Sequence, residues 1–177
     1  MTGKYVSPEL SQPQYLAQRY YLGQLCHSAA FYFALGNHDG EGGSKGSNVW
    51  ATQTRKKYFP NPYPNTFFTG NDITEPEVGL PENYYAFEWG NALFVVIDPY
   101  WHSDVAVDNQ PNIEGNKGKK DPWSITLGIK QYEWLKKTLE NSKSKFKFVF
   151  AHHVNGTGRG GVERAKYYEW GGFGQNG

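Results

Sequence analysis

The chain has 177 residues, which is enough for one domain with a hydrophobic core. Its 18 basic and 17 acidic residues nearly cancel, and this balance argues against a strongly basic nucleic-acid-binding surface. No apolar stretch approaches the roughly 20 residues of a membrane span, and the first residues lack the apolar region of a signal peptide. We therefore expect no membrane partner. The compartment and the oligomeric state stay undetermined, and a secreted parent protein stays open.

The single cysteine, Cys26, excludes an internal disulfide and any metal site built from several cysteines. We expect Cys26 to be a small buried thiol without a chemical role.

The first half of the chain alternates periodic and irregular segments. Residues Pro13 to Leu25 have helical periodicity, with Ser11 as a candidate N-cap. The unbroken apolar run Ala29–Leu35 predicts a buried strand. A glycine-rich loop follows, and residues 47–82, rich in Pro, Asn and Thr, are predicted to be a long irregular surface segment.

The second half predicts a hairpin, a helix and a strand. The segments Tyr84–Trp89 and Ala92–Asp98 read as strands joined by the tight-turn pair Gly90-Asn91. After a polar loop at 102–124, apolar residues recur at helical spacing from Ile129 to Leu139, and Lys145–Ala151 forms the last strand. We therefore expect residues 1–177 to form one mixed α/β domain, with helices on a face of buried strands.

Two polar clusters follow predicted strands. The first is Gly36-Asn37-His38-Asp39. Its asparagine offers an amide oxygen to a metal, its histidine can bind a metal or donate a proton, and its aspartate can fix the tautomer of a histidine. Taken alone, the same residues also fit an ordinary turn after a strand.

The second cluster is His152-His153, directly after the last predicted strand. Adjacent residues of an extended chain point to opposite sides, so only one of the pair is expected to serve a given site. A buried histidine with one satisfied hydrogen bond is the alternative. Because ligand sites gather at the carboxyl ends of strands in α/β sheets, the two clusters are candidates for one site.

Three segments in this order resemble calcineurin-like metallophosphoesterases related to purple acid phosphatases. LGNHDGEGG is similar to the family's Gly-Asn-His-Asp/Glu block, and NYYAFEWGNALFVVID is similar to its Tyr-x-x-Phe hairpin. QYEWLKKTLENSKSKFKFVFAHHV is similar to the helix and strand that lead to a ligand histidine. The resemblance implies an αββα sandwich, in which mixed β-sheets are flanked by helices, and hydrolysis of phosphate esters by metal-activated water.

The resemblance also implies residue roles. Asn37 and His152 would bind metal, His38 would act as acid near the phosphoryl group, and Asp39 would orient His38. The choice between His152 and His153 stays open, because the family often has proline where this chain has Val154. The parent would hold two divalent or trivalent ions, with Fe, Zn and Mn all suited to such ligands.

Several family blocks are absent from the sequence. An Asp-x-His block and a Gly-Asp-x-x-Asp block are missing before Leu35, and a Gly-His-x-His block is missing after His153. We therefore expect an internal fragment, truncated at both ends, that lacks full activity. The alternative is a non-catalytic binding or structural module, whose aromatic-rich loops at 47–82 and 102–124 recognise a glycan or a protein partner.

Overall fold

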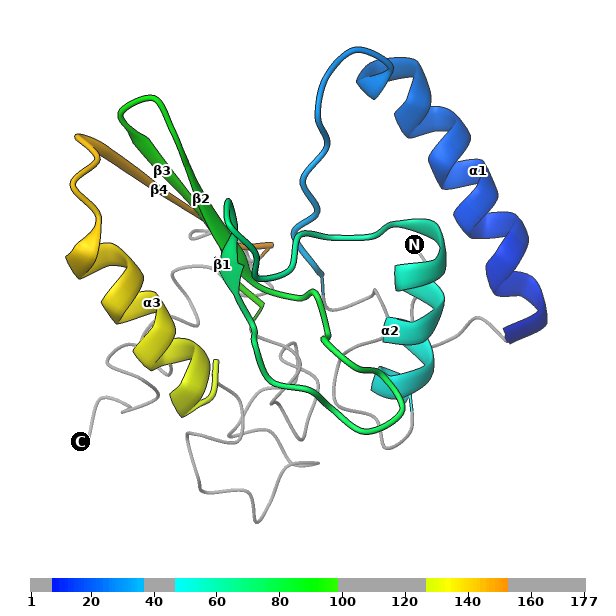
Figure 1. The fold of residues 1–177 in the computed structure, drawn as a ribbon. Helices are drawn as coiled ribbons and strands as arrows, with labels where there is room; N and C mark the ends of the chain where they lie inside the picture. Colours follow the sequence, from blue (N-terminus) through cyan, green and yellow to red (C-terminus); the bar gives the residue numbers. More distant parts are fainter. Residues whose placement is uncertain (1–7, 37–46, 99–126, 153–177) are drawn as a thin grey trace, which may run out of the picture.

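A computed structural model describes residues 8–36, 47–98 and 127–152 of the chain. These residues form a mixed α/β structure with a four-stranded sheet and three helices. The elements run in the order α1, α2, β1, β2, β3, α3 and β4. Figure 1 shows the sheet between α3 on one side and α2 and α1 on the other. The predicted mixed α/β class is therefore confirmed.

Helix α1 spans Pro8–Cys26, so the predicted helix is present but begins earlier than expected. Ser11 lies inside it and is not its N-cap, because helical geometry already starts at Pro8. Three apolar residues at helical spacing, Leu16, Tyr20 and Leu25, are all exposed. Helix α1 contacts α2 mainly where the Tyr15 ring stacks on Tyr58, at 5.1 Å between centroids.

Residues 47–82 are not a wholly irregular segment, as was predicted from their composition. Helix α2 occupies Ser47–Tyr58, and the short strand β1 occupies Thr69–Gly70. The helix is stabilised by tertiary contacts, since the buried Arg55 guanidinium donates to the carbonyl oxygens of Pro81 and Glu82 at 2.6 and 3.1 Å. Such long-range anchoring leaves little periodicity in the sequence for a prediction to detect.

The predicted hairpin is confirmed. Strands β2, Tyr85–Trp89, and β3, Ala92–Val96, pair in antiparallel register around Gly90-Asn91. Gly90 has φ +61°, a conformation that the first position of such a turn requires and that glycine adopts without steric cost.

Strand β4, Phe146–Phe150, pairs in parallel with β3, and helix α3, Ile129–Asn141, connects the two strands. Both elements match the prediction, including the helix end at Asn141 with Ser142 as its C-cap. The sequence predicts buried strands, however, and all residues of β4 are exposed. It lies at the edge of the sheet in the order β1-β2-β3-β4.

The two faces of the sheet differ in chemistry. On one face, Ala86, Leu93 and Val95 form a buried core against Trp134, Leu135 and Leu139 of α3. On the other face the rings form a continuous row, with Phe87 stacked on Phe94 at 5.2 Å and Phe94 on Phe148 at 5.6 Å. We call this second surface the aromatic face; its members are Tyr85, Phe87, Phe94, Phe146, Phe148 and Phe150.

Residues 29–35 are not a strand, although their apolar run predicted one. No described residue of this segment pairs with the sheet. The segment lies against the aromatic face, where Tyr32 stacks on Phe87 at 4.7 Å and the Phe33 carbonyl accepts a hydrogen bond from the Tyr85 hydroxyl. Ring packing therefore replaces the ladder that an apolar run usually forms.

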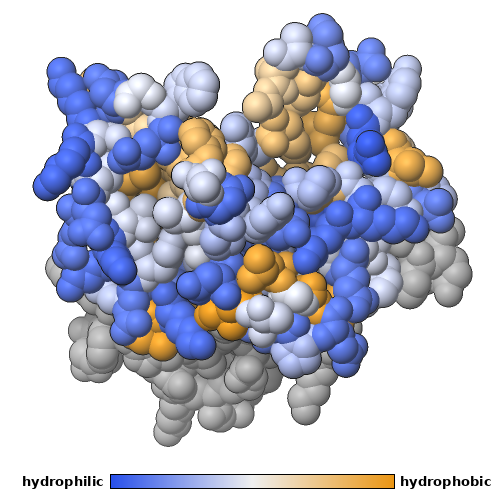
Figure 2. All heavy atoms as spheres, viewed as in Figure 1, coloured by the Kyte–Doolittle hydropathy of each residue, from blue (hydrophilic) through white to orange (hydrophobic). Residues whose placement is uncertain are grey.

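The surface between the elements is uneven. Figure 2 shows apolar residues among hydrophilic ones on the face viewed, and a notch between the upper part of α1 and the sheet. Cys26 is half-buried, not fully buried as expected, and it lines a small hollow with Arg19 and Phe33. No helix in the described part of the chain is long and apolar enough to cross a bilayer.

Candidate functional site

His152 is the one predicted site residue that the structure describes, and it lies just beyond the carboxyl end of β4. Its imidazole is directly against Gly36: a Cβ at that glycine would lie 3.0 Å from both Cε1 and Nε2. Gly36 itself is buried, as is Leu35 before it. The two polar clusters thus meet at their flanks, because Gly36 is one peptide bond away from Asn37.

Contacts with the sheet and with the residue after α2 position the segment that ends at Gly36. The Tyr85 hydroxyl of β2 donates to the Phe33 carbonyl at 3.0 Å, and the Phe33 ring packs on Phe59 at 5.4 Å between centroids. Burial raises the pKa of Tyr85 well above its usual range, so the phenol stays protonated and keeps donating this hydrogen bond. The chain is therefore held on the aromatic face as it approaches His152.

Asp98 lies at the same edge of the sheet. Val96 pairs with Phe150 at the ends of the two strands, and Asp98 and His152 each lie two residues beyond these ends. The backbone amide of Ile97 donates to the Phe150 carbonyl at 3.1 Å, which keeps the two chain ends side by side. Because β3 and β4 are parallel, their carboxyl ends lie at one edge, as expected for a ligand site.

Buried side chains fix the Asp98 end of β3. Its carboxylate accepts a hydrogen bond from Asn83 at 2.8 Å, and Asn83 in turn accepts one from Asn71 at 2.8 Å. Gln131 of α3 accepts from the Asp98 amide at 2.8 Å and donates to the Asp98 carbonyl at 2.6 Å. Each of these side chains is at most 2 % exposed, which indicates a structural role as the support of the edge.

This network was not anticipated from the sequence. Asn71, Asn83 and Gln131 are spread over 60 positions, and no local pattern links them. A signal was nevertheless present, since Asn83 and Asp98 flank the hairpin that the sequence does predict. Their side chains bridge the two outer ends of that hairpin.

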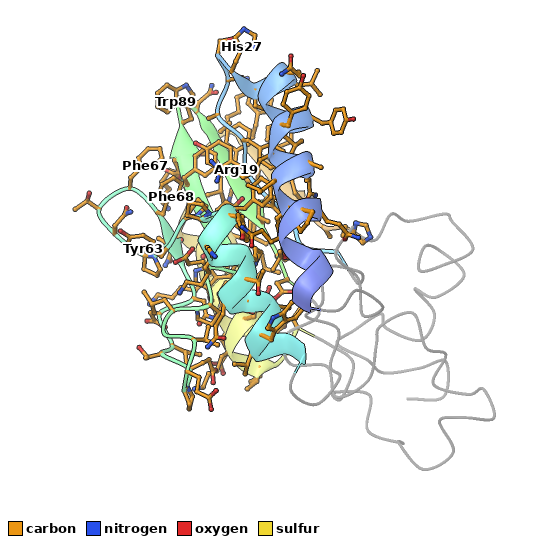
Figure 3. All side chains as sticks on the ribbon, turned by 90° about the vertical axis from the view of Figure 1, so that its right-hand side faces the viewer. Arg19, His27, Tyr63, Phe67, Phe68 and Trp89 are labelled. Atoms are coloured by element: carbon orange, nitrogen blue, oxygen red, sulfur yellow. The ribbon has the colours of Figure 1, made fainter. Side chains whose placement is uncertain are left out.

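The remaining predicted residues lie outside the described ranges. Asn37, His38 and Asp39 are in the segment 37–46, and His153 begins the segment 153–177. Within the described ranges, no three His, Cys, Asp or Glu side chains form a group that could hold a metal ion. His27 is remote from the site, since Figure 3 shows it just past the end of α1, at the margin of the molecule.

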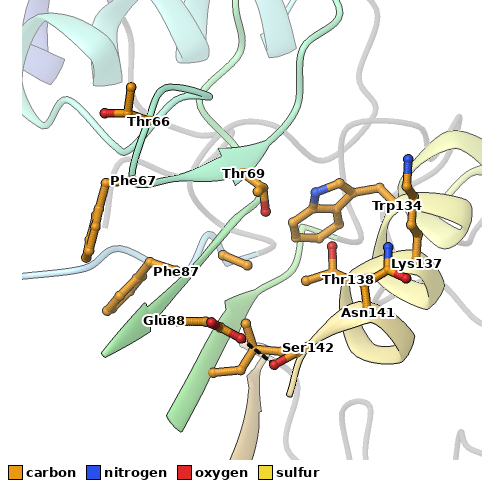
Figure 4. A pocket seen from close by; sticks show the side chains of 12 residues that line it. Thr66, Phe67, Thr69, Phe87, Glu88, Trp134, Lys137, Thr138, Asn141 and Ser142 are labelled. Atoms are coloured by element: carbon orange, nitrogen blue, oxygen red, sulfur yellow. Dashed lines mark hydrogen bonds between the residues drawn. The ribbon is translucent and has the colours of Figure 1, made fainter. Parts of the chain in front are cut away.

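A second concavity lies along the β1–β2 side of the sheet, and residues from both faces of the sheet line it. It is a groove of about 520 Å³ between α3 and the strands β1 and β2, and Leu93 contributes to its lining. Figure 4 shows Trp134 and Thr138 of α3 on one side of the groove and Phe67 with Phe87 on the other.

One carboxylate of this groove is held in place. Glu88 accepts hydrogen bonds from the hydroxyls of Ser142 and Ser144 at 2.5 and 3.0 Å (Figure 4 draws the first). These two hydrogen bonds lower the pKa of the Glu88 carboxyl, so that it stays ionised near neutral pH. The groove therefore combines aromatic walls with a fixed negative charge and several hydroxyl groups.

Comparisons with protein-family models, with curated proteins and with solved structures found no match for this chain.

Proposed function

We propose that this chain carries one part of a metal-dependent phosphoesterase site, and that the complete protein hydrolyses phosphate esters. In this proposal Asn37 and His152 are metal ligands, His38 is the general acid and Asp39 orients His38. The contact between Gly36 and the His152 imidazole is the observation that supports it most directly. It places Gly36, the residue before Asn37, against His152, although Gly36 and His152 are 116 residues apart in the sequence.

The donor chemistry around His152 suits a transition metal. A neutral imidazole and an amide oxygen both bind Zn, Fe or Mn. Gly36 leaves room for the imidazole, because a Cβ at this position would lie 3.0 Å from Cε1 and Nε2, which is closer than ordinary van der Waals contact. When bound, metal ions would supply a nucleophilic water at neutral pH and would neutralise charge on the phosphate.

The proposed roles of His38 and Asp39 follow from the chemistry of their side chains. Histidine titrates near neutral pH, so His38 can hold a proton and give it to the leaving oxygen of the ester. Asp39 would hold the imidazolium form of His38 and fix its orientation. Monoesters, diesters and nucleotides remain equally compatible substrates.

We propose that the described sheet and helices are part of an αββα sandwich. The sheet carries α3 on one face, while its opposite aromatic face is only partly covered, with Phe146, Phe148 and Phe150 each 46–47 % exposed. Contiguous exposed apolar side chains often mark an interaction site. A second sheet packed on the aromatic face would bury these rings, as the sandwich arrangement requires.

Metal binding to the purified chain tests the proposed function. We expect one weakly held Zn²⁺ or Mn²⁺ ion, measured by calorimetry, because two ligands hold an ion less firmly than the usual four. His152→Ala should abolish this binding. His27→Ala is the matched control, since His27 is an exposed histidine at the end of α1.

Two results would contradict the proposal. Equal metal affinity in the native chain and in His152→Ala would remove His152 as a ligand. About two tightly held ions per chain would instead show that the chain holds a complete metal site, against the expected incompleteness.

A second candidate function, a non-catalytic glycan-binding module, is favoured by the groove beside α3. Its Trp134 and Phe67 rings and the fixed Glu88 carboxylate are groups that bind sugar faces and hydroxyls. This function predicts saturable glycan binding that EDTA leaves unchanged and that Glu88→Ala weakens. The phosphoesterase proposal predicts neither effect.

A further inference from the structure

Strand β4 presents an open edge. It pairs with β3 on one side, and no other strand in the described part of the chain pairs with its other side. All five of its residues are exposed, and Val149 is 47 % accessible. Such an edge is a template for a further strand, and sheets that leave it uncovered tend to associate through it.

The hydrogen bonds to β3 determine which backbone groups point outward. The Phe146 amide donates to the Asn91 carbonyl, and the Phe150 carbonyl accepts from the Ile97 amide, both at 3.1 Å. Because backbone direction alternates along a strand, Phe148 also faces β3, while Lys147 and Val149 direct their amide and carbonyl groups away from it. The outward backbone groups of Lys147 and Val149 are therefore available for pairing.

The sequence of β4 is complementary to itself in one antiparallel register. When Phe148 lies opposite Phe148 of a second copy, Lys147 lies opposite Val149 and Phe146 opposite Phe150. The outward groups of Lys147 and Val149 then form the hydrogen-bonded pairs, and Phe148 forms the closer pair without backbone hydrogen bonds. The aromatic row that runs from Phe87 through Phe94 to Phe148 would continue into the second copy.

The neighbouring registers are less favourable. A strand must shift by two residues to keep the same side chains on the same face. A shift in one direction places Lys147 directly opposite its own copy, and like charges in that position destabilise a sheet. A shift in the other direction places Val149 opposite its own copy and leaves Phe146 without a partner inside β4.

We propose that two copies of this chain associate edge to edge through β4, with a two-fold axis at Phe148, to form one continuous sheet. The symmetry makes the interface isologous, so that each Lys147–Val149 contact occurs twice. The proposal does not depend on metal binding or on the catalytic roles proposed for the site residues.

Charge variants at Val149 test both the association and its register. Val149→Lys would place a second ammonium opposite Lys147 of the partner copy, whereas Val149→Glu would place a carboxylate there. Both variants introduce one charged side chain at the same exposed position, so each serves as the control for the other. Circular dichroism checks that both fold as the native chain does.

Sedimentation equilibrium over a range of concentrations gives the dimer dissociation constant of each form. We expect Val149→Lys to dimerise at least about tenfold more weakly than Val149→Glu at low ionic strength, because the charge contact is made twice. Added salt should narrow the difference. A native chain that stays monomeric throughout, or equal dissociation constants for the two variants, would overturn the proposal.

A cysteine cross-link gives a second measurement that does not depend on Val149. Phe148→Cys in a Cys26→Ser background should form an interchain disulfide under mild oxidation, because position 148 faces its own copy at the axis. Phe146→Cys in the same background should form it much more slowly. Equal rates for the two positions would rule out this register.

Discussion

At the residue scale, the position of the His152 ring depends on the absence of a side chain at Gly36. The requirement on Gly36 is steric, since its missing Cβ is what allows the imidazole to lie against the backbone. A histidine in contact with a buried backbone segment has fewer orientations than one on an open loop. Reduced freedom of this kind favours ligand binding because less entropy is lost.

Gly36→Ala should therefore displace the His152 ring. We expect the added methyl group to move the imidazole away and to weaken Zn²⁺ or Mn²⁺ binding by at least about tenfold, since ligand placement controls affinity. Imidazole proton shifts in NMR spectra report the displacement, and calorimetry reports the affinity.

Gly23→Ala is the matched control for this change. Gly23 lies inside α1, and a Cβ there would meet nothing within 4 Å. This control should leave metal binding unchanged and should stabilise the helix by about 0.5–1 kcal/mol. Native NMR shifts of His152 and native affinity in Gly36→Ala would contradict the proposed contact.

At the element scale, α3 holds the carboxyl edge of the sheet through one side chain. Gln131 lies in the first turn of α3 and bonds both the amide and the carbonyl of Asp98. A third contact reaches the Leu127 carbonyl at 3.3 Å. The helix thus fixes the end of β3 in addition to covering the core.

Gln131→Ala should destabilise the fold strongly. It leaves the buried Asp98 backbone groups without these partners, and each such loss typically costs about 1–3 kcal/mol, so we expect roughly 2–4 kcal/mol in total. Urea unfolding measures the change in free energy. Gln53→Ala is the comparison, because Gln53 makes one exposed hydrogen bond to the Glu77 carbonyl and should cost less than about 1 kcal/mol. Equal losses in the two variants would contradict the importance of the buried network.

At the scale of the whole molecule, buried tyrosines make the free energy of unfolding depend on pH in the alkaline range. Burial, with help from Asp72 and Asp98, raises the pKa of Tyr84 from 10.0 to about 12. A raised pKa means that the folded state favours the protonated phenol. The resulting stability is fully present below the unfolded pKa of 10.0, and it is lost as pH rises towards about 12.

We therefore expect the free energy of unfolding to fall between pH 10 and pH 12. Tyr84→Phe should make this fall less steep without abolishing it, because burial raises the pKa of Tyr85 in the same direction. Denaturant unfolding at a series of pH values measures the slope. Tyr20→Phe, at an exposed position on α1, is the control. A slope that Tyr84→Phe leaves unchanged would show that Tyr84 is not a source of the pH dependence.

Local signals in the sequence were sufficient for several elements. The Gly90-Asn91 turn, the periodicity of α3 and the apolar alternation of β4 each depend on interactions within a few residues, and each prediction matches the structure. The predictions for residues 29–35 and 47–58 failed for a common reason. Residues 29–35 pack through their rings on the aromatic face and do not pair with a strand, as the contact of Tyr32 with Phe87 shows. Residues 47–58 are held by the hydrogen bond from Arg55 to the distant Pro81 carbonyl.

The amino-acid sequence by itself determined the hairpin and the helix that follows it, and it is the source of the chemistry proposed for Asn37, His38, Asp39 and His152. Only the tertiary structure decided that His152 meets Gly36, that Asp98 is a buried support and that β4 is an open edge. The physical reason is distance along the chain. Turn and helix preferences act between neighbours, whereas these three features arise from contacts between segments that come together only when the sheet forms.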